Sequence, residues 1–228
     1  MTTGTGWVDP TAVAGLPGWL RPVADAAGRV VTADLSRWGP PAEGGRRGAV
    51  LVLLGEGDGG DGPEVLLIAR APDMRSHPGQ PAFPGGAIDP EDRGPVEAAL
   101  REAQEETGLD PSGVVVYAAL PDLWLPPSGF VVTPVLGWWR TTSPVRAVDR
   151  AEVASVHRVP VADLTDPGNR VRVRHPSGYI GPGFTVQGLL VWGFTGGLLD
   201  RLLHLAGWSV PWDEDRVVDL PYDDRDRP

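Results

Sequence analysis

The chain has 228 residues, enough to bury a substantial core and suggestive of one main domain. Its formal charge of -10 argues against binding nucleic acid through a basic surface, and the absence of cysteine excludes disulfides, thiolate metal sites and cysteine nucleophiles. All twenty basic residues are arginine, a planar cation that can bind phosphate through two hydrogen bonds. No signal peptide or membrane-spanning run is recognisable, so we expect a cytoplasmic protein without membrane or nucleic-acid partners.

Taken in order, the predicted elements describe a mixed α/β domain. Residues 1–45 suggest short helical pieces and are interpreted as an arm packed on the domain, which we place at 46–210. The predicted strands are 48–54 and 64–70, joined as a hairpin, and 114–120, 131–139 and 152–159. The predicted helices are 95–106, opened by Pro95 and stopped by Gly108, and 186–206. Prolines predict irregular structure over 71–86, and the acidic residues 211–228 predict a loosely attached tail.

Three acids of the central helix, Glu102, Glu105 and Glu106, fall on one face. Like charges at this spacing cost about 0.2–0.5 kcal/mol per pair in an isolated helix, so a compensating charge is expected. Arg101 supplies part of it, and a divalent cation would supply more. Oxygen ligands without cysteine favour Mg²⁺ or Mn²⁺ over Zn²⁺. Taken alone, the helix is more typical of a solvated acidic surface, because acidic runs on surface helices are common.

The glycine-rich turn before this helix favours a ligand site, because glycine lets the backbone approach a ligand closely. Residues 86–109 resemble the Nudix box, in which a glycine is followed at a distance by R-E-U-x-E-E-x-G-U, U being a bulky aliphatic residue. The residues that match are Gly86, Arg101, Glu102, Glu105, Glu106 and Gly108, whereas Ala103 is small for a U position. The resemblance implies a Nudix-type α/β/α sandwich with a mixed sheet and a catalytic loop-helix-loop.

The spacer of the box departs from the usual pattern. Gly86 and Arg101 are fifteen positions apart instead of fourteen, and Asp92 stands where the box has a glutamate. Either Asp92 or Glu91 could take over the structural role of that glutamate.

An upstream signature resembles the branch of the family that hydrolyses coenzyme A. That branch carries L-L-T-x-R-[SA]-x3-R-x3-G-x3-F-P-G-G, and this chain matches it except at Ile68, which replaces the threonine. The matching residues are Leu66, Leu67, Arg70, Ala71, Arg75, Gly79, Phe83, Pro84, Gly85 and Gly86. The resemblance implies metal-dependent cleavage of coenzyme A or a derivative to adenosine 3′,5′-bisphosphate and 4′-phosphopantetheine.

The same resemblance assigns roles within the site. The metal ligands would be Glu102, Glu105, Glu106 and a carbonyl at Gly86, and Arg101 would fix the carboxylates. The general base stays open between Glu102 and Glu105. Arg70 and Arg75 would bind substrate phosphate, or one of them would instead tie the loop to a core carboxylate.

Several alternatives remain at this point. The substrate could be ADP-ribose, a dinucleotide polyphosphate or a nucleoside triphosphate, or the chain could be a non-catalytic ligand-binding module. Glu152, at the start of a predicted strand, is not expected to be a metal ligand or base. His77 could touch substrate, but for this histidine and for His157, His175 and His204 a structural role is favoured. The partner is expected to be a small nucleotide-type molecule, and homodimer formation is left open.

Overall fold

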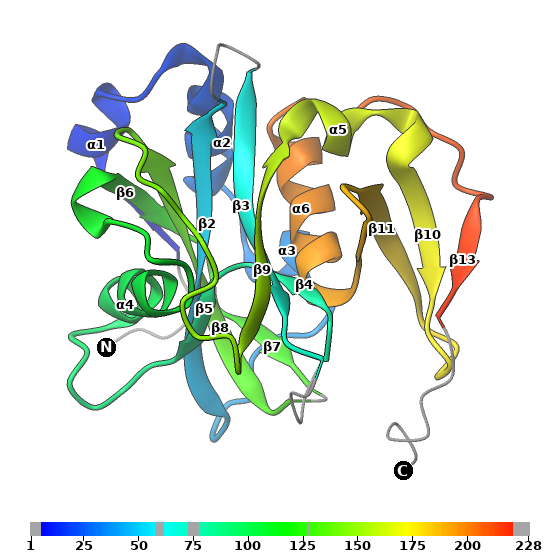
Figure 1. Ribbon diagram of the computed structural model, residues 1–228, viewed down its shortest axis with the longest axis horizontal. Helices are drawn as coiled ribbons and strands as arrows, with labels where there is room; N and C mark the ends of the chain where they lie inside the picture. Colours follow the sequence, from blue (N-terminus) through cyan, green and yellow to red (C-terminus); the bar gives the residue numbers. More distant parts are fainter. Residues whose placement is uncertain (1–5, 58–61, 73–77, 127, 221–228) are drawn as a thin grey trace.

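The computed structural model describes residues 6–57, 62–72, 78–126 and 128–220. Within them, a nine-stranded mixed sheet has helices packed on both faces, and a four-stranded sheet lies to one side (Figure 1). This arrangement confirms the predicted α/β class with a mixed sheet. No described helix combines the length and apolar character that crossing a membrane requires.

The main sheet is organised around β2 (Arg46–Glu56), which runs parallel to β8 (Phe130–Trp139) and antiparallel to β3 (Pro63–Arg70). The predicted hairpin is therefore confirmed. The other strands of this sheet are β1 (Trp7–Val8), β4 (Pro81–Ala82), β5 (Gly85–Ala87), β6 (Val114–Ala119), β7 (Leu123–Leu125) and β9 (Val153–Pro160). Both β4 and β5 fall where we expected no regular structure. β4 is two residues long and has its proline at its first position, where a strand tolerates it, and β5 begins after Pro84.

One face of the sheet is covered by α4 (Pro95–Thr107), the predicted central helix. Pro95 opens it, and Gly108 ends it in the left-handed conformation with φ of 69°, as expected. Three fully buried alanines face the sheet, at positions 98, 99 and 103. Because alanine is small, the helix axis can lie close to β2, which explains the small residue at 103.

The opposite face is covered by α2 (Arg21–Ala27) and α6 (Gly193–Leu205). The N-terminal arm (residues 1–45) also contains α1 (Pro10–Ala14), the 3₁₀ turn η1 (Gly18–Leu20) and α3 (Thr32–Leu35). Its side chains Leu20 and Val23 are buried in the same core as Leu198 and Leu202 of α6. The arm thus completes the hydrophobic core on this face.

The second sheet has the order β12-β11-β10-β13. Its strands are β10 (Arg170–Arg174), β11 (Ile180–Val186), β12 (Leu189–Val191) and β13 (Val217–Asp219), and it follows α5 (Val161–Thr165) and η4 (Pro167–Asn169). The predicted helix 186–206 is wrong in its first part. Gln187 and Gly188 have φ of 50° and 76°, which makes the two-residue turn of a β-hairpin, and the helix begins only at Gly193.

The expected loosely attached tail also needs correction at β13. This strand pairs in parallel with β10, where the N–H of Arg172 donates to the carbonyl oxygen of Arg216 at 2.8 Å. The N–H of Leu220 donates to the carbonyl oxygen of Arg174 at 3.0 Å. Ladder hydrogen bonds therefore attach this part of the tail to the sheet.

Candidate active site

Two consecutive glycines at the start of β5 bring the backbone against α4. The N–H of Gly85 donates to Oε2 of Glu106 at 2.9 Å. Gly85 has φ of 153°, and a Cβ there would collide with the carbonyl oxygen of Ala49. A Cβ on Gly86 would lie 2.5 Å from the carboxylate of Glu102. The backbone at position 85 therefore favours glycine, whereas a side chain at position 86 would have to displace the carboxylate of Glu102. The turn and the helix form one continuous surface.

Glu106 is the most deeply placed acid of this surface, with 3% of its area exposed. Burial raises the pKa of its carboxyl to about 8, although the N–H of Gly85 opposes that shift. Burial also raises the pKa of Glu102, against the opposing charge of Arg101. Near neutral pH, Glu106 therefore holds a proton unless a cation takes its place.

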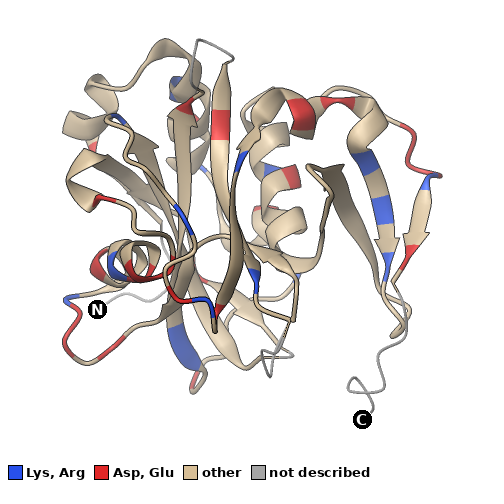
Figure 2. Ribbon diagram, viewed as in Figure 1, with Lys and Arg blue, Asp and Glu red and all other residues tan. Residues whose placement is uncertain are grey.

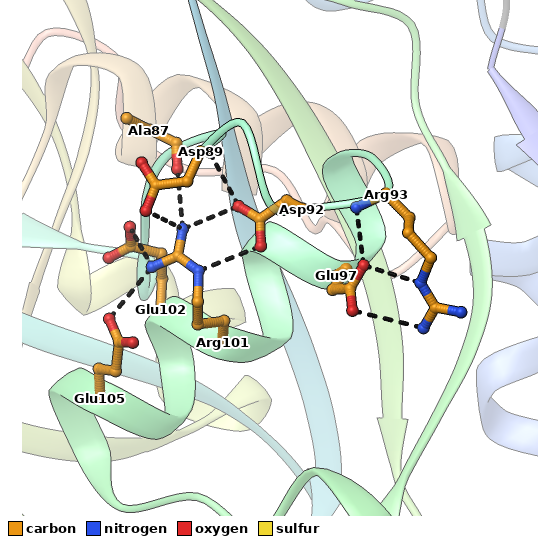
Figure 3. A network of polar contacts seen from close by, with 8 residues as sticks. All are labelled: Ala87, Asp89, Asp92, Arg93, Glu97, Arg101, Glu102 and Glu105. Atoms are coloured by element: carbon orange, nitrogen blue, oxygen red, sulfur yellow. Dashed lines mark hydrogen bonds and ion pairs between the residues drawn. The ribbon is translucent and has the colours of Figure 1, made fainter.

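Arg101 connects the acids of the site through its guanidinium group (Figure 3). Nη1 donates to Oε1 of Glu102 at 3.0 Å and to Oε2 of Glu105 at 3.1 Å. On the other side, Nε and Nη2 donate to the two carboxylate oxygens of Asp92 at 3.1 and 2.9 Å. Nη2 also donates to the carbonyl oxygen of Ala87 at 3.1 Å. The bonds to Asp92, and after them those to Glu102, raise the pKa of Arg101. All of these bonds together fix the orientation of the guanidinium group.

Asp92 is the residue that anchors Arg101 to the preceding loop. Its side chain is 4% exposed, and its Oδ2 also accepts the N–H of Asp89 at 2.9 Å. The hydrogen bond from Arg101 is the main cause of its lowered pKa. Glu91 is exposed and is not among the partners of Arg101. The alternative left open by the sequence is therefore decided in favour of Asp92.

Residues 141–152, which we call the strap, cross the C-terminal end of α4. The N–H of Arg146 donates to the carbonyl oxygen of Thr107 at 2.9 Å, and that of Val148 donates to the carbonyl oxygen of Glu106 at 3.1 Å. Carbonyls in the last turn of a helix have no partner within the helix, so the strap satisfies two of them. The strap is thereby fixed to the helix that carries the acids.

The strap ends at Glu152, whose carbonyl oxygen accepts the N–H of Ala71 at 2.8 Å. Its carboxylate lies close enough to raise the pKa of both Glu102 and Glu106. From sequence, Glu152 was not expected to be a metal ligand or base, and that expectation stays a prediction, but its charge acts on the same group of acids. Nothing in the periodicity of 141–152 signals this, because the contact spans more than forty residues of chain.

A family model described as NUDIX domain matches residues 45–178, more than half of the chain. The chain belongs to the Nudix family. It is 40% identical over 156 residues to a protein of Cronobacter sakazakii named "Uncharacterized Nudix hydrolase NudL", over 64% of this chain and 76% of that protein. An Escherichia coli K12 protein of the same name is 37% identical over 152 residues, with the same coverage of each chain. The protein is therefore a Nudix pyrophosphohydrolase.

Solved Nudix structures resemble the chain at lower identity. RenU, a Nudix hydrolase of M. smegmatis, is 22% identical with a TM-score of 0.48, over 76% of this chain and 94% of that one. An Ap4A hydrolase of C. elegans in a binary complex is 20% identical with a TM-score of 0.43, over 51% and 82%. Neither likeness assigns a substrate to this chain.

Nudix hydrolases generally use divalent cations such as Mg²⁺ or Mn²⁺, and the donor set fits such an ion. The site offers carboxylate oxygens and the backbone at Gly86, and hard cations prefer oxygen ligands. The buried carboxyl of Glu106 would exchange its proton for the cation. In the described part of the chain, no three acidic or histidine side chains already converge on one point. Arg101 engages Glu102 and Glu105, whereas Glu106 is bonded to the glycine turn.

The remaining predicted site residues lie in different places. Arg70, at the end of β3, lowers the pKa of Glu106 by its charge, and its buried Nε has no hydrogen-bond partner among the described residues. Arg75 and His77 lie outside the described residues. Phe83 is 2% exposed and packs in the main core. The other histidines occupy separate surroundings: His157 bonds Ser155, His175 stacks on Trp192, and His204 is on α6.

Proposed function

We propose that this Nudix enzyme hydrolyses the pyrophosphate bond of coenzyme A or a derivative, with Mg²⁺ or Mn²⁺. The observation that carries the proposal is the buried Glu106 bonded to the glycine turn, with Arg70 beside it. A carboxylate for a cation and an arginine with an unused donor are the two groups that a pyrophosphate substrate requires. The upstream signature over 66–86, which contains both Arg70 and the turn, supports coenzyme A as the substrate.

Each residue of the site has a role in this proposal. Glu102, Glu106 and the carbonyl of Gly86 would hold the cation, and Glu105, with 60% of its side chain exposed, would bind a further ion or its water shell. Arg101 would keep the carboxylates in place. Arg70 and Arg75 would bind phosphate oxygens of the substrate.

The chemistry is attack of water on one phosphorus of the pyrophosphate, with cleavage of the bridging P–O bond. A bound divalent cation would lower the pKa of water and neutralise charge on the phosphates. The chain's own groups would accept the proton of the attacking water. Glu102 and Glu105 were the candidates from sequence, and Glu152 joins them because its charge acts on both Glu102 and Glu106.

A substrate panel tests the proposal. The full chain would be incubated with coenzyme A, acylated coenzyme A, ADP-ribose, diadenosine tetraphosphate and a nucleoside triphosphate, with Mg²⁺ or Mn²⁺, and the products identified by mass spectrometry. We expect the highest kcat/KM for coenzyme A or its acyl derivative, with release of adenosine 3′,5′-bisphosphate. A higher kcat/KM for another member of the panel would replace the substrate, and binding without any product would favour a non-catalytic module.

A pair of variants tests whether Glu152 is the general base. Glu152→Gln removes a carboxylate near the site, and Glu91→Gln removes an exposed one that has no contact with Arg101. If Glu152 accepts the proton, its variant should lose about 100-fold or more in kcat and lose the acidic limb of the pH profile, while the control keeps both. Equal activity of the two variants would exclude Glu152.

Cytoplasmic location and the division of the chain into arm, domain and tail remain predictions, and homodimer formation stays open.

A further inference from the structure

The strap forms a fixed wall beside the acids of the site. Beyond its two bonds to α4, Oδ1 of Asp149 accepts the N–H of Ala151 at 2.8 Å. The carbonyl oxygen of Asp149 accepts the N–H of Glu152 at 3.2 Å and that of Val153 at 2.8 Å. These bonds close a tight turn around Arg150. The backbone of Arg150 is therefore held at a definite place next to Glu152.

Arg150 has no partner among the residues that the structure describes, although the protein is acidic overall. Seven arginines in the described part of the chain form ion pairs with carboxylates, at positions 47, 93, 101, 158, 170, 172 and 174. Arg150 is exposed and, among the described residues, makes no hydrogen bond, ion pair or ring contact. Its charge is thus available to an anion from solution.

Arg150 lies near the acids of the site, but Arg70 is the arginine beside the buried acid. Two residues of chain span at most about 7 Å, so its backbone lies within that distance of Glu152. Arg70 is the arginine whose charge acts on the buried Glu106, and Arg150 is not among the main charges that do so. Arg150 instead stands on the strap between two anchored points, Val148, whose N–H donates to the carbonyl oxygen of Glu106, and Glu152, whose carbonyl oxygen accepts the N–H of Ala71.

We propose that Arg150 is a specificity residue that binds a phosphate lying outside the scissile pyrophosphate. This inference rests on the proposed function, because the 3′-phosphate of coenzyme A is such a group. A guanidinium can bind it through two parallel charge-assisted hydrogen bonds. The strap holds the arginine while the acids of α4 hold the cation, so one substrate bridges the two.

Coenzyme A and dephospho-coenzyme A differ only in the 3′-phosphate and provide the test. The kcat/KM of the full chain would be measured on both with Mg²⁺, for the native protein and for Arg150→Gln. A charge-assisted contact predicts a native preference for coenzyme A of about 10-fold or more. Arg150→Gln should remove most of that preference by raising KM for coenzyme A, with kcat and the dephospho substrate little changed.

Two further variants sharpen the result. Arg146→Gln removes another exposed arginine of the strap, whose backbone bonds the last residue of α4. This variant should keep the native preference for coenzyme A over dephospho-coenzyme A. Arg150→Lys keeps the charge without the paired donors and should give an intermediate preference. If Arg150→Gln alters both substrates by the same factor, or neither, the assignment is wrong. If the native protein cleaves neither substrate, the proposed function fails, and this inference with it.

Discussion

Two regions of the molecule use arginine and carboxylate groups in opposite ways. Figure 2 shows acids on α4 and in the loop before it, and arginines along β10. In the first region, Arg101 is partly exposed, with 27% of its side chain accessible, and bonds oxygen atoms of four residues. In the second, Arg170 is 1% exposed and pairs with one carboxylate, Asp200.

Arg170 differs from Arg101 because aromatic rings, rather than hydrogen-bond acceptors, surround its guanidinium group. Its Cζ lies 4.6 Å from the ring centroid of Phe184 and 4.7 Å from that of Trp212. Its Nε and Nη1 have no hydrogen-bond partner among the described residues. Aromatic faces stabilise the cation without directing its donors, so Arg170 joins the tail to the core. Arg101, surrounded by acceptors, instead orients carboxylates. The first region therefore gathers and orients carboxylates, and the second attaches the tail to the core.

The largest expected effect comes from Glu106→Gln. The variant keeps the shape of the side chain but removes the charge that would hold the cation. Mutation of residues that only hydrogen-bond to metal ligands typically lowers metal affinity or activity by about 10–100-fold. Loss of a ligand itself should therefore lower kcat by at least about 100-fold. Titration calorimetry should show weaker Mn²⁺ binding. Glu105→Gln, at the exposed rim, should lose less. Unchanged turnover in a folded Glu106→Gln protein would contradict the metal role.

The second region is tested by Trp212→Ala, which uncovers the guanidinium of Arg170. Loss of the ring contact and of buried area should cost about 2 kcal/mol, which lowers Tm by roughly 4–8 °C. Catalysis should be unaffected, because the ring lies away from the acids of α4. Glu214→Gln is the control: its ion pair with Arg172 is exposed, so Tm should change by less than about 2 °C. A drop in kcat without a drop in Tm would overturn the division between the regions.

A smaller effect is expected for Asp92→Asn. The change keeps the size of the side chain but weakens the two bonds that orient Arg101, so kcat should fall by about 10-fold and Mn²⁺ affinity should fall with it. Asp89→Asn provides the comparison, because Asp89 lies 3.4 Å from Arg101 and is 53% exposed. Should the two variants behave alike, Asp92 would not be the residue that positions Arg101.

A further effect is expected on the pH dependence of stability without divalent metal. Folded Glu106 keeps its proton up to about pH 8, whereas the unfolded chain releases it near pH 4.5. Between these values the folded state binds more protons, so the free energy of unfolding should fall as pH rises. Denaturation in the presence of a chelator at pH 6 and pH 8 would measure the fall. Glu106→Gln should flatten it, and an unchanged slope would show that another group is responsible.

The sequence by itself determined the elements that depend on neighbours along the chain. Pro95 and Gly108 delimit α4, and its periodicity places Glu102 and Glu106 on one face, because helix geometry and capping act over a few residues. The hairpin of β2 and β3 followed from apolar runs and a glycine-rich loop. The box and upstream signature were likewise local, which is why the family was predicted correctly.

Tertiary structure alone decided what depends on contacts distant in sequence. It selected Asp92 over Glu91 as the partner of Arg101, brought Glu152 to the acids of α4 through the strap, and paired β13 with β10. The apolar run before α6 became a strand because its residues pair with β11, which outweighs a helical pattern broken by Gly188. Such contacts gain their free energy only once separate segments meet, and no local pattern encodes that meeting.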